Sequence, residues 1–357
     1  MIKAYYPLLT NTTYLNTAYV GLMSTQLAEF RRAHEEFYLQ NGGDQYKMQA
    51  YDDLDSMHQN FASFFGLTAD RCLGTSNFST GIRTALSFLP KKAKVLLIEE
   101  DYPSLTDAFR EEGFDSTKIA MQPQIEQAIK EKLKSETFGI LALSIVQYTS
   151  GLLIDQEFLF SLKKEYPSLI IIGDGTQFLG AHPFHFDKSP FDLVAGSGYK
   201  WLLGGFGNGI VMLSKAFIAM TSQKVDAIRE RFFNGHFNIL GMASLDFAIR
   251  ELVQHDFQSL VKEKAALSEE VKSQLIANEF LPQWVSERSK HSSIFNIKGG
   301  EELFAFLHKH NIRCVQRGSG VRVSFHFYNT ENDLNKLLKT LKTLLKKKLF
   351  LRIFVKK

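Results

Sequence analysis

The chain has 357 residues, of which 45% are hydrophobic and 22% are charged. This balance is that of an ordinary globular protein, so it excludes a disordered or collagen-like chain, and the length indicates about two domains. The two cysteines, Cys72 and Cys314, are too few for a disulfide-stapled secreted scaffold, and they favour a reducing compartment.

The positive charge of the chain is concentrated at its C-terminal end. The formal net charge is +4, but residues 336–357 hold nine of the 42 basic residues and no acidic residue, which leaves a net charge of −5 on residues 1–335. The first residues carry no export signal, and no stretch reaches the roughly 18 apolar residues that cross a membrane. The sequence therefore predicts a soluble, cytoplasmic protein.

Short apolar runs alternate with amphipathic stretches between residues 93 and 213. Each run has only a few residues and the richest are β-branched, which is typical of fully buried strands. The predicted strands are Lys94–Ile98, Phe138–Ser144, Leu169–Gly173, Leu193–Ala195 and Gly209–Leu213. The predicted helices around them are Ile82–Leu89, Gln124–Ser135 and Gln156–Tyr166. This alternation indicates an α/β fold in which a mostly parallel, doubly wound sheet carries helices on both faces.

The pattern changes after about residue 238. One long, bent helix is predicted over Leu240–Glu279, because this stretch carries no strand signal. The elements predicted beyond it are a strand at His291–Ile297, a helix at Glu301–His310, strands at Arg313–Gln316 and Val321–Phe327, and a helix from Asn332. We therefore expect a large domain over residues 15–240 and a smaller α+β domain, with its linking helix, formed by residues 1–14 and 241–357.

The final helix has leucines at helical spacing and lysines on its other faces. The leucines are Leu334, Leu337, Leu338, Leu341, Leu344 and Leu345. Such a helix either binds a membrane surface or a nucleic acid, or packs on the protein through its leucines and exposes its lysines. We favour the packed helix, because nothing else along the chain supports a nucleic-acid role. We expect neither a nucleic acid nor a membrane as a partner.

Polar residues follow one of the predicted strands, and in doubly wound sheets ligands bind beyond the carboxyl ends of the strands. Asp174 closes the run that begins at Leu169, and Gln177 lies within reach of the same pocket. A carboxylate at the end of a buried strand needs a cationic or hydrogen-bonding partner, which favours a ligand site. The alternative is an ordinary loop or helix-capping aspartate.

A glycine-rich segment follows the next predicted strand. Residues 196–209 hold six glycines and Lys200, and the glycines allow close approach of the backbone to a ligand. The spacing is neither that of a Walker loop nor that of a dinucleotide fingerprint. Between aromatic neighbours, partial loss of water lowers the pKa of Lys200 and allows a Schiff base to a carbonyl compound. The alternative is a surface lysine on a flexible loop.

A third candidate is Thr75–Gly81, where hydroxyl groups precede a predicted helix and form an anion site. The alternative there is ordinary capping of the helix by Ser79 or Thr80. An amine that traps a carbonyl, a carboxylate for a buried cation and a phosphate cradle are together required by one small molecule, pyridoxal 5′-phosphate (PLP). We therefore expect PLP as the cofactor, and no metal.

Two motifs of the chain resemble those of the class V aminotransferases, a family of fold-type I PLP enzymes that includes the cysteine desulfurases. They are Gly173–Gln177 and Ser197–Leu202. Further segments that resemble motifs of this family are Tyr14–Ala18, Asn77–Gly81, Gly235–Asn238 and Arg322–Thr330. The resemblance runs nearly end to end and implies the fold of a fold-type I PLP-dependent transferase.

The resemblance implies a role for each matching residue. Lys200 forms the Schiff base and moves the Cα proton, while Asp174 pairs with the ring nitrogen. Gln177 lies near the phenolic oxygen, and Tyr102 stacks on the cofactor ring. Arg322 binds the substrate carboxylate, the alternative being an ion pair on the strand surface. The residues expected to catalyse the reaction are Lys200, Asp174 and Tyr102, and those expected at the phosphate are Ser79, Thr80, Ser197 and Tyr199.

Three positions depart from the family pattern. Tyr199 replaces the histidine that usually precedes the lysine, and Tyr148 stands where many relatives have an asparagine near the ring. His236 replaces a threonine that in relatives reaches the phosphate of the neighbouring subunit. Tyr148 and His236 are still expected to contact the cofactor.

The resemblance implies a homodimeric PLP enzyme that acts on an amino acid, with aminotransfer as the leading reaction. The alternatives are a cysteine desulfurase or selenocysteine lyase, another C–S lyase, an epimerase, or a regulatory protein that only binds the cofactor. Desulfurases carry their nucleophilic cysteine in a loop that is missing here between Arg317 and Arg322. Cys314 and Cys72 are expected to be buried, which disfavours persulfide chemistry.

Overall fold

The computed structural model describes residues 2–233 and 235–354, with side chains described for residues 3–233 and 235–347. A seven-stranded sheet has the order β2-β8-β7-β6-β5-β3-β4. The strands are β2 (Cys72–Thr75), β3 (Val95–Ile98), β4 (Ser116–Ile119), β5 (Ile140–Ser144), β6 (Ile170–Asp174), β7 (Leu193–Ser197) and β8 (Gly209–Leu213). Only β8 within this sheet runs antiparallel to its neighbours, β2 and β7. The mostly parallel sheet predicted from the sequence is confirmed.

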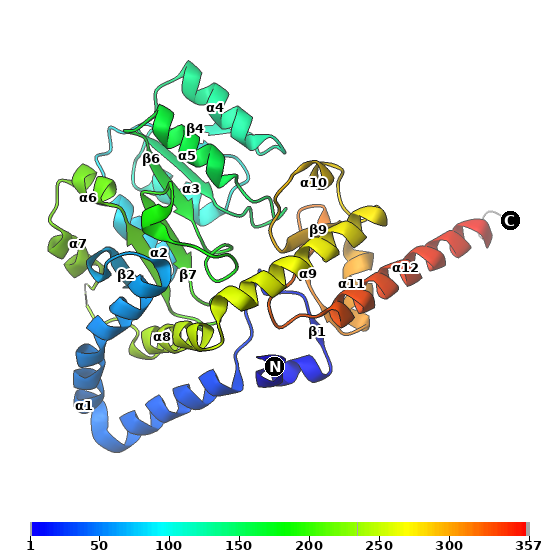
Figure 1. The fold of residues 1–357 in the computed structure, drawn as a ribbon, viewed down its shortest axis with the longest axis horizontal. Coiled ribbons are helices and arrows are strands. Elements are labelled where there is room, and N and C mark those ends of the chain that lie inside the picture. Colours follow the sequence, from blue (N-terminus) through cyan, green and yellow to red (C-terminus); the bar gives the residue numbers. More distant parts are fainter. Residues whose placement is uncertain (1, 234, 355–357) are drawn as a thin grey trace.

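Helices cover both faces of this sheet, as the doubly wound pattern predicts (Figure 1). One face packs on the end of α1 (Thr25–Phe65) and on α4 (Ile125–Ser135), α5 (Gln156–Glu165) and α8 (Ile239–Gln254). The other face packs on α2 (Phe78–Leu86), α3 (Pro103–Glu111), α6 (Lys215–Thr221) and α7 (Val225–Phe232). Successive strand residues point to opposite layers, so Ile140 faces one layer and Leu141 the other.

The C-terminal part of the chain has its own sheet and its own hydrophobic core. β9 (Ile294–Lys298), β11 (Val315–Arg317) and β12 (Gly320–Ser324) form an antiparallel sheet, and α11 (Glu301–Lys309) and α12 (Glu331–Phe354) share its core. β1 (Thr13–Tyr14) pairs with β10 (Ile312–Arg313), which brings the N-terminal residues to this part. On this basis we propose the domain boundary near residue 240.

The remaining elements are short. They are α10 (Trp284–Glu287) and the 3₁₀ turns η1 (Ile2–Tyr5), η2 (Pro7–Thr10), η3 (Ala69–Arg71) and η4 (Phe186–Lys188).

The prediction of one bent helix over Leu240–Glu279 is wrong. The chain forms α8 and a separate helix, α9 (Phe257–Ala277), and the break falls at Asp256. Asp256 has a φ of 54°, which lies outside the helical range, and its side chain accepts a hydrogen bond from the backbone N–H of Ser259. The aspartate thus caps a new helix. α9 runs between the large sheet and the C-terminal part (Figure 1).

Several elements were not predicted from the sequence. They are α1, α3, α6, α7, α10, β1, β2 and β4. α1 is long and turns at Gly42, where a φ of 82° interrupts the helical path, and Figure 1 shows it as a bent arm on the outside of the molecule. Much of this helix is polar and exposed, so it lacks the apolar periodicity from which helices are recognised. The predicted strand Arg313–Gln316 is divided between β10 and β11, with Cys314 between them.

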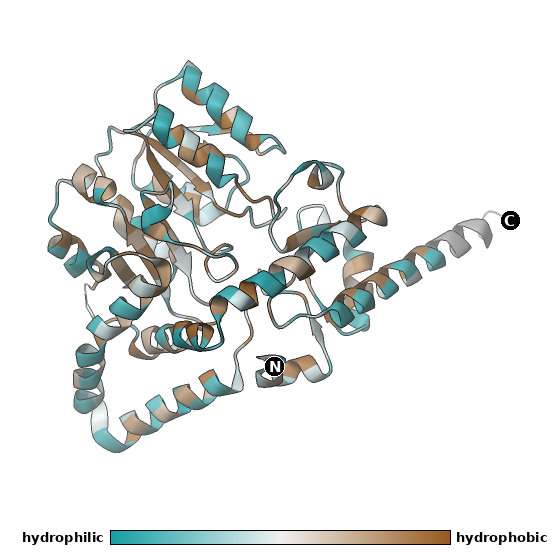
Figure 2. Ribbon diagram, in the orientation of Figure 1, coloured by the Kyte–Doolittle hydropathy of each residue, from teal (hydrophilic) through white to brown (hydrophobic). Residues whose placement is uncertain are grey.

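The last helix packs through its leucines, as predicted. Five of the six leucines, Leu334, Leu337, Leu338, Leu341 and Leu344, are buried, while Leu345 is 51% exposed. Figure 2 shows apolar residues along the strands of the sheet and hydrophilic residues on the outer sides of the helices. Within the described part of the chain, no helix has the length and apolar character that a membrane crossing needs.

Candidate active site

Asp174 and Lys200 lie at the same edge of the large sheet. Asp174 is the last residue of β6, and Lys200 stands in the turn that follows β7, the parallel neighbour of β6. Parallel strands end at the same edge, which brings the carboxylate and the amine together. Asp174 is 4% exposed and Lys200 is 8% exposed. The alternative of a surface lysine is therefore wrong, and Asp174 is a strand residue and not a helix cap.

Aromatic rings surround the Lys200 amine, and glycine fixes its backbone. The Nζ atom lies 5.8 Å from the ring centroid of Tyr102 and 5.7 Å from that of Tyr199. Gly21 packs against the Lys200 carbonyl so closely that a Cβ atom there would lie 2.1 Å from the carbonyl oxygen. Toward the described residues, Nζ makes neither a hydrogen bond nor an ion pair. The backbone of Lys200 is therefore held in place, while its amine keeps its hydrogen-bonding capacity for a ligand.

Burial changes the pKa of both groups. Loss of water raises the pKa of the Asp174 carboxyl to about 6 and lowers the pKa of the Lys200 amine to about 8. Attraction between the two charges opposes both changes, and the positive charge of Arg322 lowers the pKa of Lys200 further. The backbone N–H of Thr176 donates to Asp174 Oδ1 at 2.8 Å and favours the carboxylate form. The amine thus gains and loses its proton close to neutral pH.

Tyr102 and Tyr148 lie against each other beside this pair. Their rings meet edge to face, with centroids 5.6 Å apart. The backbone N–H of Tyr102 donates to Asp101 Oδ1, and that of Ser144, at the end of β5, donates to Asp101 Oδ2, both at 2.7 Å. Asp101 is buried and thus fixes Tyr102 against the sheet. This aspartate was not predicted as a site residue, although its position next to Tyr102 was a usable signal.

Residues 75–81, the turn that leads into α2 and that we expect to bind an anion (the anion turn), have a helix cap that differs from the two residues considered in the sequence. Asn77 Oδ1 accepts a hydrogen bond from the backbone N–H of Thr80 at 2.9 Å, so Asn77 caps the helix, and not Ser79 or Thr80. Ser197 Oγ accepts from the backbone N–H of Phe78, also at 2.9 Å. Ser197 therefore joins the end of β7 to the start of α2.

Two further hydroxyl groups connect this turn to its surroundings. Ser79 Oγ bonds to Ser104 Oγ on α3 at 2.9 Å. Thr176 Oγ1 accepts from the backbone N–H of Ser197 at 3.3 Å, while its own backbone N–H bonds Asp174. Thr176 thus links the carboxylate to the anion turn. It was missed from the sequence, although it lies inside the motif that contains Asp174.

Gln177 ties the Lys200 segment to the N-terminal part of the chain. Its Oε1 accepts from Trp201 Nε1 at 2.8 Å, and its Nε2 donates to the Ala18 carbonyl at 2.7 Å. Tyr199, on the other side of Lys200, stacks on Phe206 with centroids 5.0 Å apart. The residues that flank Lys200 are therefore both anchored.

Arg322 is a buried cation, in contrast to the predicted alternative of a surface ion pair. Its side chain is 2% exposed, and Nη1 donates to the Tyr148 carbonyl at 2.5 Å. It forms no ion pair with any carboxylate of the described residues. Burial and the nearby Arg317 lower the pKa of the guanidinium, which stays protonated at neutral pH because an arginine starts so high. The surface ion-pair interpretation is wrong.

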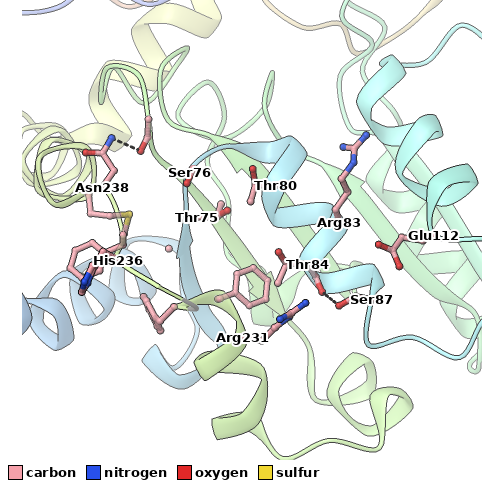
Figure 3. A pocket seen from close by; sticks show the side chains of 16 residues that line it. Thr75, Ser76, Thr80, Arg83, Thr84, Ser87, Glu112, Arg231, His236 and Asn238 are labelled. Atoms are coloured by element: carbon pink, nitrogen blue, oxygen red, sulfur yellow. Dashed lines mark hydrogen bonds between the residues drawn. The ribbon is translucent and has the colours of Figure 1, made fainter.

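His236 lies apart from Lys200. A cavity of about 400 Å³ runs along α2, between that helix, α7 and residues 235–238 (Figure 3). Thr80, Arg231 and His236 line this cavity, whereas Lys200 does not. His236 is exposed, and its Nδ1 lies 3.3 Å from Tyr51 Oη on α1. Within the described chain, His236 thus lies near the anion turn, in a cavity that Lys200 does not line.

The two cysteines are free and buried, as predicted. Cys72 begins β2, and Cys314 lies between β10 and β11. Burial raises the pKa of the Cys314 thiol to about 12 and also raises that of Cys72. Both sulfurs therefore stay protonated at neutral pH, and neither is a ready nucleophile.

The fold is similar to solved structures of PLP enzymes. A C-DES protein with glycine covalently linked to its PLP cofactor is 16% identical, with a TM-score of 0.82 over 95% of this chain and 98% of that one. The cysteine desulfurase of Thermococcus onnurineus NA1 is 19% identical, with a TM-score of 0.79 over 97% and 98% of the two chains. The cysteine desulfurase CsdA of Escherichia coli is 17% identical, with a TM-score of 0.79 over 96% and 97%. These similarities show fold-type I of the PLP enzymes.

The sequence itself also matches a family. No curated protein matches the chain significantly. Residues 27–337, however, match the family Aminotransferase class-V, and this range is most of the chain. The chain therefore belongs to the class-V aminotransferases, a family of PLP-dependent enzymes.

Proposed function

We propose that the chain binds PLP through Lys200 and uses it to transform an amino acid, with aminotransfer as the leading reaction. One observation carries this proposal, the joint burial of an amine, a carboxylate and a guanidinium, none of which forms an ion pair with a described residue. These are Lys200, Asp174 and Arg322. Burying charges without partners is costly, so the arrangement supports a ligand that provides the partners.

The groups of PLP fit the groups of the chain. Asp174 would hold the protonated ring nitrogen, and Lys200 would bond the aldehyde. At the start of α2, the backbone N–H groups of Phe78 and Thr80 already bond Ser197 Oγ and Asn77 Oδ1. The phosphate would therefore take the backbone N–H of Ser79 and the hydroxyl group of Thr80, in the first turn of a helix of nine residues. When bound, PLP supplies an electron-withdrawing ring that stabilises negative charge at Cα of an amino acid.

The side chains of this protein have defined tasks around that ring. Lys200 Nζ takes a proton from Cα and returns one, which suits a pKa of about 8. Asp174 keeps a proton on the ring nitrogen. Tyr102, whose ring lies beside the amine, covers the cofactor and keeps water away. Asp101 and Thr176 orient these groups through the hydrogen bonds described above.

We propose that Arg322 binds the carboxylate of the amino acid. A guanidinium is planar and donates two parallel hydrogen bonds to a carboxylate. Its charge forms no ion pair with a carboxylate of the described protein, and it lowers the pKa of Lys200. This would place the Cα atom of the substrate close to the lysine.

Cleavage of a C–S bond is the second candidate reaction. It is supported by the similarity in fold to the cystine C-S lyase C-DES. A desulfurase that stores sulfur on its own cysteine is not supported, because the chain has two cysteines and both are buried as thiols. We propose that the enzyme acts in the cytoplasm, where such thiols stay reduced.

We further propose a homodimer in which α1 takes part in the interface. Four large apolar side chains on both sides of the Gly42 turn are exposed, and monomers rarely expose so many together. They are Tyr38, Leu39, Met48 and Tyr51. Tyr51 also contacts His236, at the cavity along α2, so this face would bring a second copy close to the anion turn.

The first experiment is the visible absorbance of the purified protein with added PLP. We expect a yellow wild type, and we expect Lys200→Ala to lack the band of a lysine-bound cofactor because the amine is missing. The exposed Lys188 provides the matched control, and Lys188→Ala should keep the band. A wild type that stays colourless would overturn the assignment of Lys200.

The same protein is then titrated with amino acids, including cystine. A keto acid without free ammonia indicates aminotransfer, release of ammonia and a sulfur product indicates C–S cleavage, and racemised amino acid indicates epimerisation. A coloured protein whose band no amino acid perturbs would favour the cofactor-binding regulatory protein.

The lowered pKa of Lys200 predicts its reactivity in the cofactor-free protein. The rate at which an amine reagent modifies Lys200, followed by peptide mass spectrometry, should have its midpoint near pH 8. In Asp174→Asn the midpoint should move to lower pH, because the negative charge that stabilises the ammonium is gone. Asp226→Asn, at an exposed site on α7, should leave the midpoint unchanged. An unchanged or higher midpoint in Asp174→Asn would contradict the pairing.

Loss of the guanidinium should weaken substrate binding more than cofactor binding. In Arg322→Gln the amino-acid concentration that half-saturates the spectral change should rise roughly 10- to 100-fold, as expected for lost hydrogen bonds to a charged group. Arg322→Lys should recover part of the loss. Arg313→Gln, on the exposed side of β10, is the control. Equal half-saturation in Arg322→Gln and wild type would exclude the carboxylate role.

The dimer is tested by light scattering of the PLP-loaded protein. We expect twice the mass of one chain, and a shift toward one chain in the double variant Leu39→Glu/Met48→Glu, since charges are costly in an apolar interface. Phe160→Glu, at a partly exposed site on α5, should keep the wild-type mass. A wild-type species of single-chain mass that binds PLP would refute the homodimer.

A further inference from the structure

Lys264, on α9, is a second buried lysine that the proposed chemistry does not use. It is 2% exposed, and its Nζ donates to Ser293 Oγ at 2.6 Å. Ser268 Oγ bonds in turn to Ser293 Oγ at 2.8 Å. No carboxylate pairs with Lys264 anywhere in the described chain. Lysines are among the residues least often buried without a counter-charge, so this position calls for an explanation.

The surroundings of Lys264 do not favour its charged form. The charge of Lys264 acts on two other titratable groups, His182 from the turn after β6 and His326 from the segment after β12. Burial lowers the pKa of His326 to about 3 and that of His182 well below its usual value, so both are neutral. Burial also lowers the pKa of Lys264 to about 7. At pH 6 the Lys264 amine is therefore a buried cation, and its hydrogen-bond partner is the hydroxyl group of Ser293.

The amine lies over the residue that follows the reactive lysine. Lys264 Nζ is 5.5 Å from the ring centroid of Trp201. The indole stacks on His326, and its N–H bonds Gln177. The backbone of Trp201 is also packed tightly, because a Cβ atom on Gly180 would lie 2.8 Å from its carbonyl oxygen. Because Trp201 directly follows Lys200 in the chain, a shift of α9 against the indole would also displace the backbone of Lys200.

We propose that Lys264 is a positioning residue for Lys200, which acts through the indole of Trp201, and that protonation of its buried amine loosens this contact. The indole face attracts a cation, but the cost of burying a charge with a single hydroxyl partner is larger than this attraction. The larger cost favours a movement of α9 that admits water. The proposal rests on the assignment of Lys200 as the reactive lysine. The contact between Lys264 and Trp201, however, is testable without cofactor.

The test follows the fluorescence of Trp201 in the cofactor-free protein. The chain has two tryptophans, so Trp284→Phe leaves Trp201 as the reporter. We expect its emission to change in a one-proton transition near pH 7. The emission is followed from about pH 5.5 to about pH 8.5, the range in which a group with that midpoint titrates. An emission that stays constant over this range would overturn the proposal before any variant of Lys264 is made.

Three variants in the same background assign the transition. Lys264→Met keeps the length and removes the charge, so it should abolish the transition, whereas Lys264→Arg should resemble the low-pH wild type at every pH. Lys272→Met, at a buried lysine of α9 that bonds the Arg288 carbonyl, should keep the transition. A transition that persists in Lys264→Met belongs to another group and overturns the proposal.

The consequence for Lys200 is read from PLP binding. Between pH 8 and pH 6 the Kd for PLP should rise more in the wild type than in Lys264→Met. One linked proton changes a Kd by up to about tenfold for each pH unit. If the Kd for PLP depends on pH equally in the two proteins, although Lys264→Met has lost the fluorescence transition, the positioning role is refuted. Absence of PLP binding in both would instead refute the proposed function and leave the fluorescence result to judge the contact.

Discussion

The parallel pairing of β6 with β7 governs the rest of the site. It sets Asp174 opposite Ala195, so that a carboxylate and, five residues beyond Ala195, the amine of Lys200 come to the same buried edge. Burial drives their pKa values toward each other, to about 6 and about 8, because it penalises both charges. The sheet therefore creates both a place for a ligand and the chemical need for one.

The elements around this edge fix the reacting groups without neutralising them. Asp101 accepts a hydrogen bond from the backbone N–H of Tyr102, and the backbone N–H of Thr176 donates one to the carboxylate of Asp174. Gly21 allows the chain to approach the carbonyl of Lys200, where any side chain would clash. The amine itself has aromatic neighbours and no hydrogen-bond partner in the described chain. Such a site is rigid in its framework and unsatisfied at its centre, which is the condition for binding a charged cofactor tightly.

The C-terminal part completes the site from the other side. Arg322 reaches the Tyr148 carbonyl from β12, and Lys264 reaches the indole of Trp201 from α9. These contacts join segments far apart in the sequence, and both involve buried cations without a carboxylate partner in the described protein. Both parts of the chain therefore contribute to the surroundings of Lys200 and Trp201.

The central strands could be predicted from the sequence, because short β-branched runs are typical of buried strands. The positions of Asp174 and Lys200 at one edge of the sheet could also be predicted, because the ends of parallel strands converge in this fold. The sequence did not reveal α1, whose polar surface lacks apolar periodicity, nor the break at Asp256, where one capping aspartate ends a helical pattern. Two features became visible in the folded molecule alone. Arg322 is buried without an ion pair to a described residue, and His236 lines a cavity that Lys200 does not line. Burial and distance between remote residues arise from packing, which no local pattern encodes.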